Sequence, residues 1–226
     1  MTSNLPYLDK PSPWSSHSLL AARLKTLPAE SKILDVGTAS GTLARMCQNH
    51  ALHFFGVEMN PEWAQMAAPL YEKIWIGHIA EIEENALKNY DAVVLGDVLE
   101  HLATPEVVLQ KLIALQTSSS IFLISVPNIT NLWVRLNLLI GRFDYTDRGI
   151  LDRTHLRFFT RKTLVQMINH SGLKIVSIQV TPIPLELVSR FFVSPLGKIF
   201  HAVFAKLTSL FPTLLGYQFI VEAKKP

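Results

Sequence analysis

The sequence is poor in cysteine and in charge, and both shortages limit what the protein can be. Cys47 is its one cysteine, so no disulfide forms within the chain and no zinc site can be built from several thiolates. Charged residues make up 17% and the formal net charge is only +3, which gives no reason to expect a nucleic-acid partner. We expect a protein of a reducing compartment that does not bind nucleic acid.

Long uncharged runs are missing as well. No window reaches the roughly 18 apolar residues expected of a membrane span. The first residues, MTSNLPYLDKPSPW, lack the basic start, apolar run and small-residue cleavage site of a signal peptide. Apolar residues nevertheless make up 49% of the 226 residues, enough for a sizeable core. These features predict a cytoplasmic globular protein.

Short apolar runs alternate with segments of helical periodicity, which predicts an α/β fold with a largely parallel sheet and helices on both faces. We expect strands within 32–37, 52–60, 73–79, 90–102, 119–128, 173–180 and 216–225. We expect helices within 15–28, 38–50, 62–73, 104–116 and 161–172. Thr104 and Thr160 are the predicted N-caps of the last two helices, and Gly172 is the predicted end of the last.

The chain is interpreted as one domain over residues 1–226 with three irregular parts. An N-terminal arm and helix occupy 1–29. Residues 129–159 leave the fifth strand at the edge where ligands bind, and are interpreted as a substrate loop or lid. An apolar helical insertion occupies 183–215, before the last strand.

A glycine turn joins the first strand to its helix in SKILDVGTASGTLA. Gly37 and Gly41 allow the backbone to approach a ligand, and the helix N-terminus beyond favours an electron-rich group. Glu58 ends the second strand, where a carboxylate can accept both hydroxyls of a ribose. Taken alone, these features are equally consistent with a tight turn and a solvated glutamate.

The motif order resembles that of class I S-adenosylmethionine-dependent methyltransferases. Asp35 precedes the turn, and G-T-A-S-G fits a D-x-G-x-G-x-G motif better than the G-x-G-x-x-G of dinucleotide-binding proteins. VEMNP, WIGHIAEI and DAVVLGDVLEHLATPEVVL extend the resemblance over about residues 30–180. It implies a Rossmann-like, doubly wound, seven-stranded sheet with the last strand antiparallel, and S-adenosylmethionine as cofactor.

The resemblance also implies a cofactor site. Glu58 would bind the ribose, Met59 would pack on the adenine, and Asp97 would lie near the methionine end. Asp35, Gly37 and Gly41 would surround the methionine part. The implied cofactor-binding residues are Asp35, Gly37, Thr38, Ala39, Gly41, Glu58, Met59, His78, Ile79 and Asp97.

Two positions depart from the family pattern. Ala39 replaces the middle glycine, and its methyl group fits only if the backbone angles there are ordinary. His78 replaces the aspartate that takes the adenine amino group; a neutral histidine can accept that bond through one ring nitrogen, or can be a surface residue. In the second case the backbone at Ile79 would contact the adenine.

The stretch ILDRTHLRFFT, residues 150–160, resembles a D-x-T-H-L-R-F-F motif of bacterial methyltransferases, several of which are linked to cell-surface glycans or secondary metabolites. We expect Phe158 and Phe159 to anchor the segment in the core while Asp152 and His155 face the pocket. Asp152 would then orient His155 as a general base. The alternative is a structural clasp formed by Asp152, His155 and Arg157.

His101 is a further catalytic candidate. Asp97, Glu100 and His101 resemble the acidic-x-x-Glu-His magnesium site of O-methyltransferases that act in ubiquinone synthesis and on small-RNA ends. The same D-V-L-E-H-L occurs widely in methyltransferases that use no metal, where it fixes the turn beside the methyl site. We therefore assign no metal ligand.

The insertion at 183–215 is amphipathic and mildly basic. Its apolar residues recur near helical spacing, with Arg190, Lys198 and Lys206 among the polar positions. It could cap the domain's own core, cover a greasy substrate, form a dimer face, or lie on a membrane surface through 185–215. A monomer and a homodimer are both open.

These observations predict methyl transfer from S-adenosylmethionine to a small-molecule or glycan-like acceptor, at a hydroxyl oxygen. The alternative is a non-catalytic S-adenosylmethionine-binding partner protein with the same fold. A nicotinamide-dependent oxidoreductase is a weaker alternative, because the sequence lacks G-x-G-x-x-G.

Overall fold

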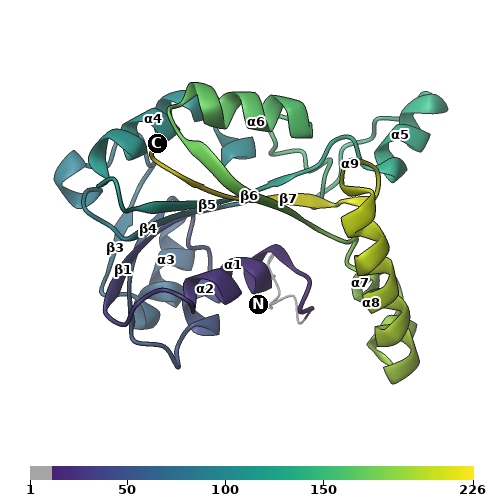
Figure 1. Ribbon diagram of the computed structural model, residues 1–226, viewed down its shortest axis with the longest axis horizontal. Coiled ribbons are helices and arrows are strands. Elements are labelled where there is room, and N and C mark those ends of the chain that lie inside the picture. The colour runs from purple at the N-terminus through teal and green to yellow at the C-terminus, as the bar shows by residue number, and fades with distance from the viewer. Residues whose placement is uncertain (1–11) are drawn as a thin grey trace.

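A seven-stranded sheet forms the centre of the protein (Figure 1). The computed structural model describes residues 12–226, so the first part of the expected N-terminal arm lies outside the described residues. The strand order is β3-β2-β1-β4-β5-β7-β6. The strands are β1 (Ser31–Val36), β2 (Leu52–Glu58), β3 (Lys73–Ile76), β4 (Ala92–Gly96), β5 (Ile121–Pro127), β6 (Lys174–Thr181) and β7 (Gln218–Lys224).

The first five strands are parallel, whereas β7 runs antiparallel to both of its neighbours, β5 and β6. This arrangement confirms the predicted fold class. The chain moves from β1 outward to β3, then returns to place β4 on the other side of β1. The strand order therefore reverses between β1 and β4, and in open α/β sheets ligands bind at the carboxyl ends of strands at such a point.

Helices cover both faces of the sheet (Figure 1). On one face lie α1 (Ser16–Leu24), α2 (Thr42–Met46) and α3 (Pro61–Ala67); on the other lie α4 (Pro105–Leu115) and α6 (Arg161–His170). Side chains of β1 alternate between the two faces of the sheet. Ile33 packs in the apolar core on the side of α1, and Leu34 packs in the core on the side of α4. This alternation is the period of two expected of a strand buried on both faces.

The helix ends follow from local chemistry. Thr160 caps α6, because its hydroxyl accepts from the Thr163 N–H at 3.1 Å, and Gly172 beyond the helix has φ +97°. Thr104 precedes α4 as predicted but makes no side-chain cap bond. Helix α2 is much shorter than the predicted 38–50, because its first residues form the glycine turn instead.

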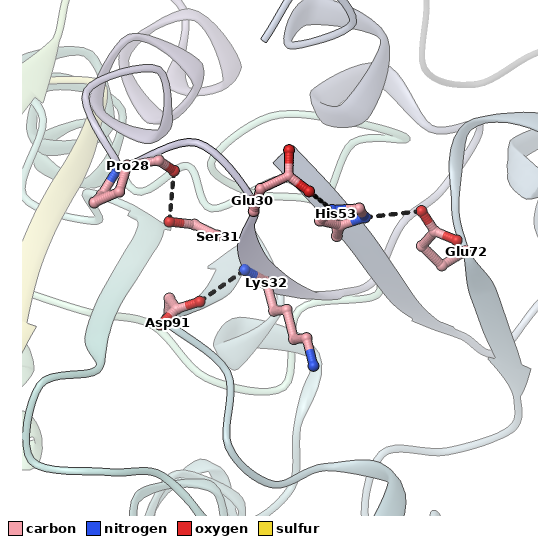
Figure 2. A network of polar contacts seen from close by, with 7 residues as sticks. All are labelled: Pro28, Glu30, Ser31, Lys32, His53, Glu72 and Asp91. Carbon is pink, nitrogen blue, oxygen red and sulfur yellow. Dashed lines mark hydrogen bonds and ion pairs between the residues drawn. The ribbon is translucent and has the colours of Figure 1, made fainter. Parts of the chain in front are cut away.

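Polar contacts tie the strands together at the amino end of the sheet, opposite the ligand edge (Figure 2). The Lys32 N–H donates to Asp91 Oδ2 at 2.8 Å and so joins β1 to the start of β4. The ring of His53 lies between Glu30 at 2.7 Å and Glu72 at 3.0 Å. These hydrogen bonds raise the pKa of His53. This network is structural and lies away from the ligand edge.

The two irregular segments lie at one end of the sheet, on the right in Figure 1. The segment after β5 contains α5 (Leu132–Leu139). The insertion before β7 contains α7 (Leu185–Val188), the 3-10 turn η4 (Arg190–Val193), α8 (Pro195–Leu210) and α9 (Pro212–Leu215). Shorter 3-10 turns are η1 (Ala68–Leu70), η2 (Glu84–Ala86) and η3 (Leu99–His101). Within residues 12–226, every helix is too short or too polar to cross a membrane.

Candidate active site

A cavity of about 530 Å³ opens at the carboxyl ends of the parallel strands. The ends of β1, β2 and β4 and the turn after β3 form its walls, and η3 and the 147–154 segment lie across it. Its volume is in the range of small-molecule and cofactor sites. Of the predicted site residues, those that line it are Gly37, Ala39, Glu58, Met59, His78, Ile79, Asp97, His101 and Asp152.

Glu58 holds the glycine turn in place. Its Oε2 accepts from the Ala39 N–H at 2.8 Å, and its Oε1 accepts from the Asn60 N–H at 2.8 Å. The side chain is buried yet lines the cavity. Each oxygen of a carboxylate has two acceptor positions, so both retain one for a ligand hydroxyl. The predicted role of Glu58 in ribose binding therefore fits this geometry.

Ala39 does not have ordinary backbone angles. Its φ is +45°, between Gly37 at +78° and Gly41 at +82°. An L-residue in this left-handed region costs roughly 1–2 kcal/mol relative to glycine. The expectation that the methyl group of Ala39 fits only with ordinary backbone angles is therefore not met without cost. Ala39 nevertheless lines the cavity. The turn keeps the backbone path of the glycine motif at the cost of local strain.

Asp35 lies outside the cavity wall, as do Thr38 and Gly41. The hydroxyl of Tyr71 donates to Asp35 Oδ2 at 2.6 Å, and the carboxyl group is buried. Burial raises the pKa of Asp35 to about 7, although the Tyr71 hydrogen bond acts in the opposite direction. The structure thus places Asp35 behind the turn, bonded to Tyr71 and outside the cavity lining.

The turn after β3 brings His78 and Ile79 to the wall of the cavity. Met59, after β2, also lines the cavity and is exposed. The Ala80 N–H donates to His78 Nδ1 at 3.2 Å. A backbone N–H can only donate, so Nδ1 is the acceptor nitrogen and Nε2 carries the proton in the neutral ring. His78 can therefore donate to a ring nitrogen of a base, whereas the predicted acceptor nitrogen is already used.

Asp97 is the centre of a polar cluster between four elements. Its carboxylate accepts from Ser125 Oγ at 2.6 Å and from Gln218 Nε2 at 2.7 and 2.8 Å. Ser16 Oγ at the start of α1 lies 3.3 Å away. Asp97 itself has φ +57°, so its side chain is aimed by a left-handed backbone at the end of β4. Sequence reasoning missed Ser125 and Gln218, because a single polar residue in a buried strand does not show which distant side chain it contacts.

The 150–160 segment is anchored against the core and against η3. Phe159 is buried in the main core, and Phe158 packs in a smaller cluster with Ile150 and Leu151. The N–H groups of Leu156 and Arg157 donate to the Glu100 carbonyl at 2.8 and 3.0 Å. The Arg157 guanidinium donates to the Ala103 carbonyl at 3.0 Å. The segment is therefore clasped to η3.

The ring of His155 is oriented by a carbonyl rather than by Asp152. Its Nδ1 donates to the Ile150 carbonyl at 3.1 Å, which leaves Nε2 as the basic nitrogen. Asp152 lines the cavity, but its Oδ1 accepts from the N–H and hydroxyl of Thr154 at 2.8 and 2.6 Å. Burial acts to raise the pKa of Asp152, but these hydrogen bonds outweigh it and the pKa is lowered.

His101 lines the cavity, whereas His155 lies behind it. The two rings meet edge to face with centroids 4.8 Å apart. Burial, and the neighbouring His101, lower the pKa of His155, so its Nε2 is unprotonated at neutral pH. His101 Nδ1 lies 3.3 Å from the Thr154 carbonyl and donates to it, so its Nε2 is also the basic nitrogen.

Glu100 lies beneath these rings, almost fully buried at 1% exposed, and both carboxylate oxygens lack a hydrogen-bond partner. Burial and the nearby Asp97 raise its pKa well above the ordinary range, which favours the protonated, neutral form. Glu100, His101 and His155 each offer one ligand atom, all within 4.8 Å of one another. Asp97, the first residue of the magnesium motif, is engaged instead with Ser125 and Gln218.

Comparison with known proteins shows the family of the chain. Residues 14–178 match the model of the methyltransferase domain family. The chain belongs to that family. Among curated proteins, no sequence matches the chain.

Solved structures share its fold. A SAM-dependent methyltransferase from Archaeoglobus fulgidus is 20% identical, with a TM-score of 0.60 over 92% of this chain and 94% of that one. Magnesium protoporphyrin IX methyltransferase from Synechocystis PCC 6803, solved with bound SAH, is 16% identical, with a TM-score of 0.62 over 93% of this chain and 82% of that one.

Proposed function

We propose that this methyltransferase-family protein transfers a methyl group from S-adenosylmethionine to a small-molecule or glycan-like acceptor, at a hydroxyl oxygen. The observation that carries the proposal is the arrangement of one cavity. Glu58 and the left-handed turn lie at one part of its wall, and His101 lies at another, with Asp97 also lining it. Methyl transfer to a hydroxyl oxygen needs the cofactor aligned with the acceptor, and it is accelerated by a nearby group that takes the hydroxyl proton.

The residues present fit the cofactor. The two free acceptor positions of Glu58 suit the paired hydroxyls of a ribose, and Ala39 lines the same cavity. Asp97 places a carboxylate, fixed by Ser125 and Gln218, where a positively charged amino or sulfonium group would be stabilised. The cofactor would supply an electrophilic methyl group on sulfur.

The chain's contribution to the chemistry is alignment and proton removal. An acceptor hydroxyl beside His101 would lose its proton to Nε2 as its oxygen forms the new bond to carbon and the carbon–sulfur bond breaks. His155, whose basic nitrogen faces the same cluster, would support the charged imidazolium of His101 only weakly, because its own ring is neutral. His101 is therefore the proposed base, with Asp152 and His155 shaping the acceptor side.

Titration calorimetry with S-adenosylhomocysteine, S-adenosylmethionine and NAD tests the cofactor. We expect the first two to bind and NAD not to bind. Glu58→Gln should weaken binding by roughly 10- to 100-fold, the value of a hydrogen bond to a charged group. Glu62→Gln, an exposed glutamate in the first turn of α3, is the matched control and should bind as the original protein does. Tight NAD binding would contradict the proposal.

A non-catalytic partner protein with the same fold predicts a different pattern. It would bind S-adenosylhomocysteine, yet transfer no labelled methyl group to hydroxyl-bearing metabolites or glycans. Transfer that is lost in His101→Gln with cofactor affinity unchanged would favour the enzyme. Binding without transfer to any acceptor would favour the partner protein.

A further inference from the structure

Helix α8 presents its small and polar residues to the protein and its large apolar residues to solvent. The buried residues of the helix are Gly197, His201, Ala205 and Thr208. A second stripe is between 45% and 70% exposed and comprises Leu196, Ile199, Phe200, Val203, Leu207 and Leu210. The usual amphipathic helix of a globular protein has the reverse arrangement.

Specific contacts fix this orientation of α8. A Cβ added at Gly197 would lie 2.1 Å from the Phe191 carbonyl oxygen, so only glycine allows the helix to sit this closely on η4. His201 Nδ1 lies 3.3 Å from Glu186 Oε2, and both side chains are buried. Rotating the helix to bury its apolar stripe would break both contacts. The contacts of Gly197 and His201 therefore hold the apolar stripe at the protein surface.

A single exposed leucine needs no explanation, but a continuous stripe does. The spacing of the stripe is i, i+3, i+4, i+7, i+11 and i+14, so its members lie along one line of the helix. Helix α5 adds exposed apolar residues at the same end of the sheet (Figure 1). They include Trp133, Leu136, Leu139 and Ile140. The N-cap of α5 is tied to the insertion, because Asn131 Nδ2 donates to the Gly216 carbonyl at 2.9 Å.

Charge indicates what covers this surface. Residues 187–215 contain Arg190, Lys198 and Lys206 and no aspartate or glutamate. The acidic residue that precedes this range in the sequence, Glu186, is buried against His201. A second copy of the chain would bring only more basic residues from 187–215 to a symmetric interface and no acidic partner for them. An anionic lipid surface would complement them. Lys206 lies beside Ile199 and Val203 on the helix surface, so its side chain can extend to the headgroups.

We propose that the outer face of α8 docks on an anionic lipid surface. The 16 residues of α8 would lie in the plane of the interface, with the exposed stripe in the headgroup and acyl boundary and Lys206 among the phosphates. This inference does not depend on the proposed methyl transfer. It requires only the orientation of α8 and its charge.

Flotation with vesicles tests the proposal on the full chain. We expect binding to vesicles of phosphatidylcholine with phosphatidylglycerol, and binding at least roughly tenfold weaker to phosphatidylcholine alone. Lys206→Gln should weaken binding to the anionic vesicles by roughly fivefold, the contribution of one basic residue near such a surface. Raising the salt concentration should weaken binding to the anionic vesicles.

Variants of the stripe separate insertion from charge. Ile199→Gln with Val203→Gln should lower vesicle binding by tenfold or more while folding and S-adenosylhomocysteine affinity stay unchanged. Ala202→Gln with Ser209→Gln places the same side chains at exposed positions outside the stripe and should bind as the original protein does. Failure to bind anionic vesicles, or equal binding to both vesicle types, overturns the proposal. A dimer that the Ile199 and Val203 variant dissociates also overturns it, because a second copy would then cover the stripe.

Discussion

Gln218 donates its side-chain amide to both carboxylate oxygens of Asp97, at 2.8 and 2.7 Å. The two residues are 121 positions apart, and the contact joins the first residue of the last strand to the end of β4 at the switch point of the sheet. Gln218 is buried and Asp97 lines the cavity. The antiparallel strand therefore supports the ligand site as well as completing the sheet.

Gln218→Ala should remove that support. A carboxylate left with fewer donors in a partly buried site loses about 1–3 kcal/mol of stabilisation. We expect a lower melting temperature and weaker binding of S-adenosylhomocysteine, measured by thermal unfolding and calorimetry. Gln179→Ala, at an exposed position of the neighbouring strand β6, should change neither. Equal effects of the two substitutions would show that the contact with Asp97 contributes nothing.

Ala39→Gly should stabilise the protein. The φ of +45° favours glycine by roughly 1–2 kcal/mol, and the added freedom of the unfolded chain offsets about 0.4–1 kcal/mol of this gain. The expected net increase in the free energy of unfolding is about 0.5–1 kcal/mol, measured in urea. The same change at Ala22, exposed in α1, should cost about 1 kcal/mol. A loss of stability in both variants would refute the strain at Ala39.

Asp35→Asn should change how stability depends on pH. The ordinary pKa of the group, 3.8, is raised to about 7 in the folded protein. Between these values the folded state keeps a proton that the unfolded chain has lost. The free energy of unfolding should therefore fall as pH rises from about 4 to about 7, by at most about 1.4 kcal/mol per pH unit.

Urea unfolding at several pH values measures this slope. Asp35→Asn retains an acceptor for Tyr71 but cannot ionise, so the curve should become flatter over the same window. Asp144→Asn, at an exposed position, should leave the slope unchanged. An unchanged slope in Asp35→Asn would mean that the buried carboxyl is not protonated in this range.

Whether a feature of the fold or site could be predicted depends on how far apart in the sequence the residues lie that determine it. The positions of the strands, their apolar character and the glycine turn could be predicted, because each depends on residues that are neighbours in sequence. The partners of Asp97 do not, because Ser125 and Gln218 lie in other strands and single polar residues carry no period. The orientation of the His155 ring depends on one carbonyl, at Ile150, whose direction is set by the folded loop. Sequence periodicity found the apolar face of α8, but the contacts of Gly197 and His201 decide that this face points outward.

Glu100→Gln tests whether the buried carboxyl is neutral or holds a cation. Since burial and the nearby Asp97 favour the protonated form of Glu100, we expect the amide to be tolerated, with a melting temperature at pH 8 at or above that of the original protein. Methyl transfer should also survive a chelator. Glu106→Gln, exposed in the first turn of α4, is the control. Loss of transfer in Glu100→Gln, together with chelator sensitivity reversed by a divalent ion, would assign Glu100, His101 and His155 as ligands.

His101→Gln and His155→Gln distinguish the base from its neighbour. His101 lines the cavity, so its loss should lower the rate of transfer by about 10²–10⁴ with little change in cofactor affinity. His155 is held behind it by the Ile150 carbonyl, so its loss should act on loop position and raise KM for the acceptor more than it lowers kcat. His170→Gln, exposed at the end of α6, is the matched control. If His155→Gln instead abolishes kcat and the acid limb of the pH–rate profile while His101→Gln retains both, the roles of the two histidines are reversed.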